Sequence, residues 1–148
     1  MNLKEQLLQA CYGYVNKRIA SYKGEIETIK ESIDSNDKSN NEGDDSGSGK
    51  LFNDLELNAQ YLNDANKMLD TLKMINSKTV NTDVVLGSLV KTTSNNFFMS
   101  ISMGKIDIED VTYFGISLNA PIGQLLKNKV VGDAITFNEN TFTITEIK

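Results

Sequence analysis

Acidic side chains gather in one polar segment of the chain, residues 34–56. The segment holds seven acidic and two basic residues, so its net charge of −5 equals that of all 148 residues. Clustered carboxylates can bind a hard cation such as Mg²⁺ or face a basic partner surface. A solvated loop is also often acidic, and composition alone leaves that reading open. The candidate residues in this segment are Asp44, Asp45, Asp54 and Glu56.

The rest of the composition removes several other kinds of site. The chain has no histidine, which excludes His-containing catalytic triads and His-containing metal sites. Its single cysteine, Cys11, lies on a helical seam, which favours a small core residue over a reactive thiol. The acidic spacing is not that of an EF-hand loop, and "GSGK" at 47–50 lacks the first glycine of a phosphate-binding loop. No basic patch favours binding to a nucleic-acid backbone.

Two long amphipathic helices are predicted to flank the acidic segment. Apolar residues of the first step by 4, 4, 3, 4, 3 and 4 from Cys11 to Ile33, which is a heptad seam. The second repeats this design from Leu51 to Leu72, with Asn58 as a polar seam position. Two matched stripes joined by one polar connection bury most simply against each other. Residues 1–77 are therefore predicted to form an antiparallel coiled-coil hairpin with an acidic tip loop at about 34–50.

After a linker at 78–83, the pattern changes from helical to strand-like. A short helix over 120–129 is predicted to begin at the only proline, Pro121. Phe97, Met99, Ile101 and Met103 are expected to share one face of a strand. Residues 84–148 are thus predicted to form a small, mostly antiparallel sheet domain, which makes the fold class α+β. Its strands are expected at 84–91, 97–103, 111–118 and in a closing hairpin at 134–147.

The beginning of the chain bears on its location. Charged residues occur within the first five positions, and no long apolar run follows them. This pattern argues against a signal peptide or a membrane span. A single cysteine also suits a reducing compartment. We therefore expect a cytoplasmic protein that is not attached to a membrane.

The C-terminal half resembles the Gre family of bacterial transcript-cleavage and elongation factors. The resemblance rests on "VVLGSLV" (84–90), "FGISLNAPIGQLLKNKVVGDAITF" (114–137) and "FTITEI" (142–147), which follow a long helical hairpin. The family pattern is a V-x-F-G-S-x-V strand, then S-P-[LI]-G-x-A-L-L-G-K-x-x-G-D, then a closing hairpin. Here Ala120 replaces the serine before the proline, and Asn128 replaces a glycine. The resemblance in architecture covers essentially the whole chain.

The resemblance implies an FKBP-like C-terminal domain without isomerase activity that docks at the secondary channel of RNA polymerase. The coiled coil would enter that channel, where acidic tip residues help the polymerase hold Mg²⁺ and hydrolyse a backtracked transcript. It implies no catalysis by this chain alone, no tightly bound cofactor and only indirect contact with transcript RNA, and we expect a monomer. The residues chosen for docking are Leu118, Asn119, Pro121, Ile122 and Gly123.

The family's tip motif contains an Asp followed by a Glu three residues later, and two registers align it to this chain. The first register uses "NDLELNAQY" (53–61). Asp54 matches there, Leu57 occupies the Glu position, and Glu56 lies beside it, about 100° away around the helix. This register makes Asp54 and Glu56 the second choice of tip residues.

The second register places the motif's Gly-Asp pair at Gly43–Asp44, with Asp45 next to it. Gly47 then stands three residues after Asp44, so this register does not restore the Asp-x-x-Glu pair either. It makes the two helices more nearly equal in length and leaves Asp44 and Asp45 at the apex. These two residues are therefore the first choice for metal ligands shared with the polymerase.

The leading interpretation is a factor that binds RNA polymerase at its secondary channel and modulates elongation, with stimulation of transcript cleavage left open. The alternative within the same partner class is a non-cleaving regulator of that channel. Two other classes are an FKBP-like prolyl isomerase and a coiled-coil adaptor. The sequence after residue 79 shows no clear signal of an aromatic-lined pocket, which disfavours the isomerase.

Overall fold

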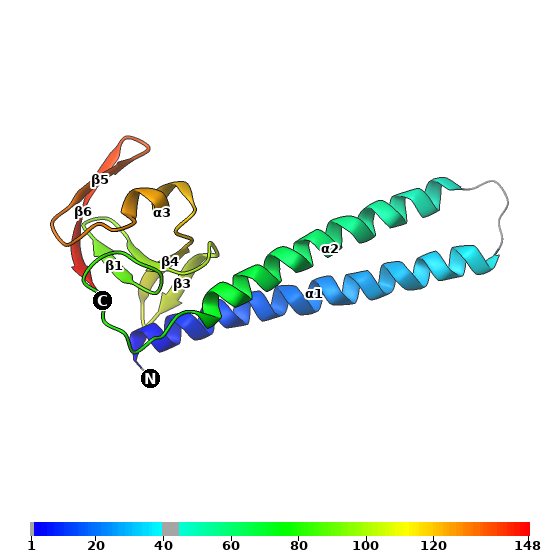
Figure 1. The fold of residues 1–148 in the computed structure, drawn as a ribbon, viewed down its shortest axis with the longest axis horizontal. Helices are drawn as coiled ribbons and strands as arrows, with labels where there is room; N and C mark the ends of the chain where they lie inside the picture. Colours follow the sequence, from blue (N-terminus) through cyan, green and yellow to red (C-terminus); the bar gives the residue numbers. More distant parts are fainter. Residues whose placement is uncertain (1, 40–44) are drawn as a thin grey trace. The chain divides into compact units, whose positions relative to one another are not determined.

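The computed structural model describes residues 2–39 and 45–148, with residues 36–39 and 45–48 described in their backbone alone (Figure 1). It divides into two compact units. We call Met1–Tyr14 with Asp70–Lys148 the sheet unit, and Val15–Leu69 the hairpin unit. The predicted α+β class is confirmed, because a helical hairpin precedes a six-stranded, mostly antiparallel sheet with one short helix. None of the helices described is long and apolar enough to cross a membrane.

The hairpin unit consists of parts of two helices, α1 (Leu3–Ser39) and α2 (Asp45–Lys73). All the predicted seam positions of both helices are buried or half-buried, including the polar Asn58. Tyr22 of α1 is in ring contact with Tyr61 of α2, and earlier residues of α1 meet later residues of α2. The helices of this unit are therefore antiparallel and lie side by side (Figure 1).

Helical structure reaches farther into the acidic segment than predicted. Residues 34–39 and 45–50 are helical, so the expected tip loop at 34–50 is wrong over these residues. A polar sequence does not prevent helix formation here, since a solvated helix face needs no apolar side chains.

At its N-terminal end, α1 begins several residues before its predicted seam. The Oδ1 of Asn2 accepts a hydrogen bond of 2.8 Å from the backbone N–H of Glu5, which caps the first turn.

The ends of both helices belong to the sheet unit. Leu7, Cys11 and Leu72 are fully buried, and Cys11 Sγ lies 3.5 Å from Ser100 Oγ. The boundary predicted at residue 77 therefore differs from the observed division, which falls after Tyr14 and before Asp70. Cys11, the first predicted seam residue, contacts Ser100, so the heptad pattern extends into residues that belong to the sheet unit.

The sheet has the strand order β3-β4-β2-β1-β6-β5. Neighbouring strands are antiparallel except β2 and β4, which run parallel. The terminal hairpin occurs where it was predicted. The strand predicted over 111–118 ends at Ile116, and the helix predicted over 120–129 ends at Leu126, because Lys127 and Asn128 leave the helical backbone conformation. The elements are β1 (Leu89–Thr92), β2 (Asn96–Met99), β3 (Gly104–Ile108), β4 (Val111–Ile116), α3 (Pro121–Leu126), β5 (Ala134–Phe137) and β6 (Asn140–Ile147).

The first two strands are shorter than predicted, and β3 was not predicted at all. Strand β1 starts only at Leu89, because Gly87 has φ +90° and the buried Ser88 hydroxyl bonds to the backbone of the preceding turn. Phe97 and Met99 belong to the main hydrophobic core, whose other buried residues are Val84, Val90, Leu126, Ile135, Phe142 and Ile144. Phe98, between them, is buried too. Ile101 and Met103 lie beyond the end of strand β2, so the expectation that they share one strand face with Phe97 and Met99 is wrong. Strand β2 ends at Met99 and is covered on both faces.

A buried lysine near the start of α1 gives a testable pH dependence. Lys4 Nζ donates a 2.7 Å hydrogen bond to the carbonyl of Thr79, and desolvation by burial lowers the pKa of Lys4. Unfolding therefore takes up a proton between the folded-state pKa and the ordinary value of 10.5. The free energy of unfolding should rise with pH across this interval, by less than about 1.4 kcal/mol per pH unit.

Urea unfolding of the wild type and of Lys4→Met at pH 8, 9 and 10 measures this contribution. The free energy of unfolding of the wild type minus that of Lys4→Met should grow with pH. Other groups that titrate at alkaline pH are present in both proteins, so their contributions cancel. Parallel curves for the two proteins would show that Lys4 titrates normally.

Candidate functional site

The preferred tip residues lie at or beyond the edge of what the structure describes. Asp44 falls outside the described residues. Asp45 is the first residue of α2, and its side chain is not among those described. The prediction that Asp44 and Asp45 hold a shared metal ion therefore stays a prediction.

The second pair of tip residues is described, and the structure does not bring the two together. Asp54 is nine residues into α2, roughly 13 Å along the axis from its start. Asp54 and Glu56 are two residues apart on a helix, so their side chains leave it about 200° apart. Asp54 is half-buried and Glu56 is exposed. Leu57, at the family's Glu position, is 44% exposed.

The described part of the chain contains no cluster of side chains suited to bind a metal ion. Among these residues, no group of three or more His, Cys, Asp or Glu side chains is arranged to hold a metal ion. The Cys11 thiol is not a ligand candidate either. Its pKa is raised by burial, with an opposing hydrogen bond from Ser100, and the side chain is fully buried. The described carboxylates and thiol therefore do not fit a Mg²⁺ site.

The five predicted docking residues fall into two groups. Asn119 and Pro121 are exposed at the start of α3. Leu118 and Ile122 are half-buried and pack against the main core, and Gly123 is buried. Only the first pair offers its side chains freely to a partner. Leu118, Ile122 and Gly123 instead pack inward and hold the start of α3 in place.

Gly123 is needed for a close backbone approach. A Cβ atom at this position would lie 2.0 Å from the carbonyl oxygen of Ser117 and 3.0 Å from Leu118 Cα. The same carbonyl accepts a 3.1 Å hydrogen bond from the N–H of Ala120. The missing side chain therefore lets α3 lie directly on the segment that follows β4.

Asn128 stands where the family pattern has glycine, and its backbone explains the exchange. It follows the end of α3 with φ +66°, in the left-handed region. Asparagine is one of the few residues other than glycine that enters this region readily. The N–H of Asn128 donates 2.8 Å to the carbonyl of Val84, and Val84 N–H donates 2.9 Å to Lys129. This departure from the family pattern therefore keeps the turn.

The turn after α3 exposes a patch that sequence reasoning missed. Leu125, Val130 and Val131 are 41%, 46% and 55% exposed, and the exposed Lys127 and Lys129 lie between them in the sequence. We call these five residues the α3 patch. Its signal was present in "LLKNKVV", an apolar and basic run with no acidic residue. Exposed apolar side chains rimmed by charge are typical of a protein-binding surface.

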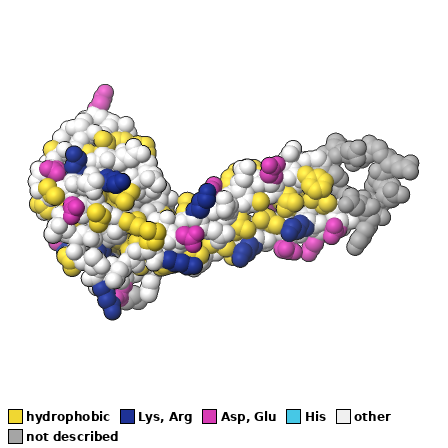
Figure 2. Space-filling model, viewed as in Figure 1, with side chains coloured by type: hydrophobic (Ala, Val, Ile, Leu, Met, Phe, Trp, Pro, Cys, Tyr) yellow, Lys and Arg dark blue, Asp and Glu magenta, His cyan; other side chains and the backbone are white. Residues whose placement is uncertain are grey.

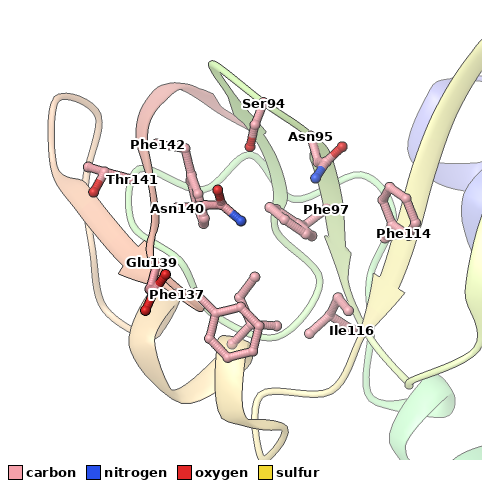
Figure 3. A pocket seen from close by; sticks show the side chains of 11 residues that line it. Ser94, Asn95, Phe97, Phe114, Ile116, Phe137, Glu139, Asn140, Thr141 and Phe142 are labelled. Carbon is pink, nitrogen blue, oxygen red and sulfur yellow. The ribbon is translucent and has the colours of Figure 1, made fainter.

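The sheet unit also contains an aromatic groove, of which the sequence showed no clear signal. Its volume is about 570 Å³. Phe97, Phe137 and Phe142 point toward the enclosed space in Figure 3, with Asn95 and Glu139 at the rim. The ring of Phe97 lies 6.3 Å from that of Phe114 and 6.0 Å from that of Phe142. The four phenylalanines come from four strands, so their spacing in the sequence gave no sign of a shared pocket.

The groove is mostly apolar, with phenylalanine and isoleucine side chains in its lining. Its single ionisable lining residue is Glu139, in the turn between β5 and β6. Ile122 also lines it, so one predicted docking residue faces this space. Helix α3 thus contributes Ile122 to the groove and Leu125 to the α3 patch.

Comparisons with known proteins gave matches among solved structures alone. No protein-family model matches the chain, and no curated protein matches it. The chain is similar to the GreA factor homolog 1 (Gfh1) of Thermus thermophilus, with 17% identity, a TM-score of 0.34, and coverage of 93% of this chain and 94% of that one. Thermus aquaticus Gfh1 gives 18% identity, a TM-score of 0.31, and 94% of each chain.

A third structure, described as the transcription factor Gfh1, shows 17% identity over 92% of each chain with a TM-score of 0.32. TM-scores near 0.3 are too low to place individual residues of this chain on those structures.

Proposed function

We propose that this chain is a bacterial transcription elongation factor that binds RNA polymerase at the secondary channel and modulates elongation. The proposal rests on one observation, which is that the Gre-like motif and the exposed α3 patch lie in the same segment. The segment that resembles the Gre family, residues 114–137, is also the one that forms α3 and exposes the α3 patch. The helical hairpin that precedes it matches the arrangement that the resemblance implies.

The chemistry of the α3 patch suits a partner with a partly apolar surface that has charged groups at its edge. The patch carries Lys127 and Lys129, and two carboxylates border it, since Asp133 Oδ2 accepts a 2.9 Å hydrogen bond from the N–H of Val130 and Asp83 is paired with Val130. Apolar side chains at the centre of an interface supply most of its binding energy, whereas charges at its rim steer association. Val131 is the most exposed of its apolar residues. We assign the patch, with Asn119 and Pro121, to docking.

The proposal gives this chain no catalysis of its own. It acts by modulating the polymerase, holds no cofactor tightly, and shares Mg²⁺ only within the complex through Asp44 and Asp45. It works in the cytoplasm as a monomer, and its contact with transcript RNA is indirect. These statements follow from the sequence resemblance and the acidic tip, and each is open to direct measurement.

The first test is binding of the purified chain to core RNA polymerase. Val131→Glu should weaken that binding by at least about tenfold, because it places a charged carboxylate in an apolar contact. Val80→Glu is the matched control, since Val80 is 78% exposed and lies outside the patch. Fluorescence anisotropy with a labelled chain gives both affinities. Failure of the wild type to bind would overturn the proposal, and equal loss in both variants would move docking away from the patch.

A second assay separates cleavage stimulation from non-cleaving regulation of the channel. Backtracked elongation complexes are incubated with Mg²⁺ and either wild type or an Asp44→Ala, Asp45→Ala double variant. Faster cleavage that the double variant loses identifies a cleavage factor with a metal-holding tip. Competition with a cleavage factor, without cleavage by this chain, identifies the non-cleaving alternative.

The aromatic groove favours one other function, which is binding of a proline-containing or apolar peptide as in an FKBP-like isomerase. Its phenylalanine lining is a physical match for a prolyl or aliphatic side chain. Turnover in a peptide isomerisation assay would favour this class over polymerase binding. The coiled-coil adaptor class predicts self-association, which light scattering measures.

A further inference from the structure

The aromatic groove of the sheet unit changes in polarity from its interior to its rim. Phe97 and Phe142 of its lining are buried. Phe114 and Phe137 are half-buried, so phenylalanine rings supply much of the interior. The polar residues of the lining are all exposed, and they are Ser94, Asn95, Glu139, Asn140 and Thr141. A ligand that suits both regions has an apolar body and a polar group at one end.

The lining of the groove carries a negative charge and no positive one. Its residues come from the segments 94–97, 114–122 and 137–142, in which Glu139 is the single charged residue. Within the described part of the chain, the Glu139 carboxylate has no ion pair and no side-chain hydrogen bond. Figure 2 shows the charged side chains of the sheet unit scattered over the face in view, without a broad basic area. The charge of Glu139 is therefore available to a cation.

Two asparagines add neutral hydrogen-bonding groups to the rim. Asn140 follows Glu139 in the chain, and Asn95 comes from the turn between β1 and β2. In Figure 3 the side-chain amide of Asn140 points into the enclosed space, toward the Phe97 ring. Neither asparagine side chain has a hydrogen bond to another described residue. Their amide oxygens can therefore accept hydrogen bonds from a bound donor.

We propose that the groove binds a small organic amine, which carries one ammonium group on an apolar body. The ring of Phe97 is in contact with those of Phe114 and Phe142, so the aromatic surface is formed before a ligand binds. Such rings attract a cation that lies within about 6 Å of their centroids. The ammonium N–H groups suit the oxygens of Glu139 and Asn140. The volume of about 570 Å³ is within the usual range of small-ligand sites.

The charge of the lining distinguishes an amine from other occupants of the groove. An anion would meet the Glu139 carboxylate and no compensating cation. A neutral apolar ligand, or the prolyl side chain of a peptide, would gain nothing from that carboxylate. Amine binding does not depend on docking to a polymerase, so the isolated chain is sufficient for the test, and its result leaves the proposed function to be judged separately.

The test is an NMR titration of the ¹⁵N-labelled full-length chain with phenethylammonium, phenethyl alcohol and phenylacetate. The three probes share a phenyl ring and differ in charge. Saturable shifts should appear at 94–97, 114–122 and 137–142 with the ammonium probe. Its affinity should exceed that of the alcohol by about three- to fivefold, as expected for an exposed charge pair supported by aromatic rings. Phenylacetate should bind more weakly than the alcohol, because Glu139 repels it.

Glu139→Gln tests the residue that gives the groove its charge. It keeps the size of the side chain and removes the carboxylate, so the preference for the ammonium over the alcohol should fall to about twofold or less. Binding of the alcohol should not change. Glu109→Gln is the matched control, since Glu109 is also an exposed glutamate in a hairpin turn with positive φ and does not line the groove. This control should keep the wild-type preference.

Several results would overturn the proposal. They are the absence of saturable shifts with the ammonium probe, equal affinities for ammonium and alcohol in the wild type, and a full preference that survives Glu139→Gln. An equal loss of preference in Glu109→Gln would do the same, because it would reflect the net charge of the chain and not the groove. Saturable binding of acetyl-Ala-Leu-Pro-Phe-amide without a response to the ammonium probe would assign the groove to a prolyl peptide instead.

Discussion

Gly123→Ala should destabilise the sheet unit by about 3 kcal/mol or more, although it adds a single methyl group. The new Cβ would meet the carbonyl oxygen of Ser117 at 2.0 Å and Leu118 Cα at 3.0 Å. Both are backbone atoms, so no side-chain rotation relieves the clash and α3 must move away from the chain beneath it. For a chain of this size, the loss corresponds to a fall in melting temperature of about 10 °C.

The matched control is Gly13→Ala, on α1 within the same unit. A Cβ at Gly13 meets nothing within 4 Å, and the position is helical. Alanine should therefore stabilise the protein by about 0.5–1 kcal/mol. Thermal unfolding followed by circular dichroism measures both changes. A Gly123→Ala protein as stable as the wild type would show that α3 can shift without cost, and Gly123 would then return to the set of residues kept for docking alone.

The behaviour of Gly123 illustrates which parts of the candidate site the sequence could predict. The motif "APIGQLL" located α3 and its proline start, because these depend on neighbouring residues. That Gly123 is buried against Ser117 depends on a contact across a turn, which spacing within the motif does not reveal. The aromatic groove was missed for the same reason, since its four phenylalanines come from four strands.

The hairpin shows the complementary case. Its seams from Cys11 to Ile33 and from Leu51 to Leu72 were predictable because each helix repeats one local pattern. The pattern could not show that Cys11 lies beside Ser100 of the sheet unit, since any apolar surroundings satisfy the same period. Strand β3 was missed although Ile106 and Ile108 alternate with charged residues. The turn at Glu109 and Asp110, both with positive φ, was its strongest local signal.

Phe98→Ala should have the second large effect, a loss of about 3–5 kcal/mol in the free energy of unfolding. Phe98 is fully buried on β2, where it is paired in register with Leu89 of β1 and Gly115 of β4. Side chains alternate between the faces of a strand, so Phe98 lies on the face opposite Phe97 and the main core. The start of α1 reaches the end of this strand, where Cys11 lies beside Ser100.

The accessibility of the single cysteine reports whether the packing around Phe98 has loosened. Cys11 Sγ lies 3.5 Å from Ser100 Oγ, and the Ser100 hydroxyl donates a 3.2 Å hydrogen bond to the carbonyl of Phe98. Removing the Phe98 ring should therefore expose the Cys11 thiol more often. A loss of about 3 kcal/mol corresponds to an increase in opening of roughly a hundredfold, since about 1.4 kcal/mol is a factor of ten.

The measurement pairs urea unfolding with the rate of Cys11 labelling by a thiol reagent under native conditions. Phe52→Ala is the control, because Phe52 is 54% exposed on α2 and its loss should change stability by less than about 0.5 kcal/mol. Loss of stability in Phe98→Ala without faster labelling would mean that the helix ends stay closed over Cys11 when β2 is weakened. Faster labelling in proportion to the loss would show that the helix ends and the sheet open together, as one cooperative unit.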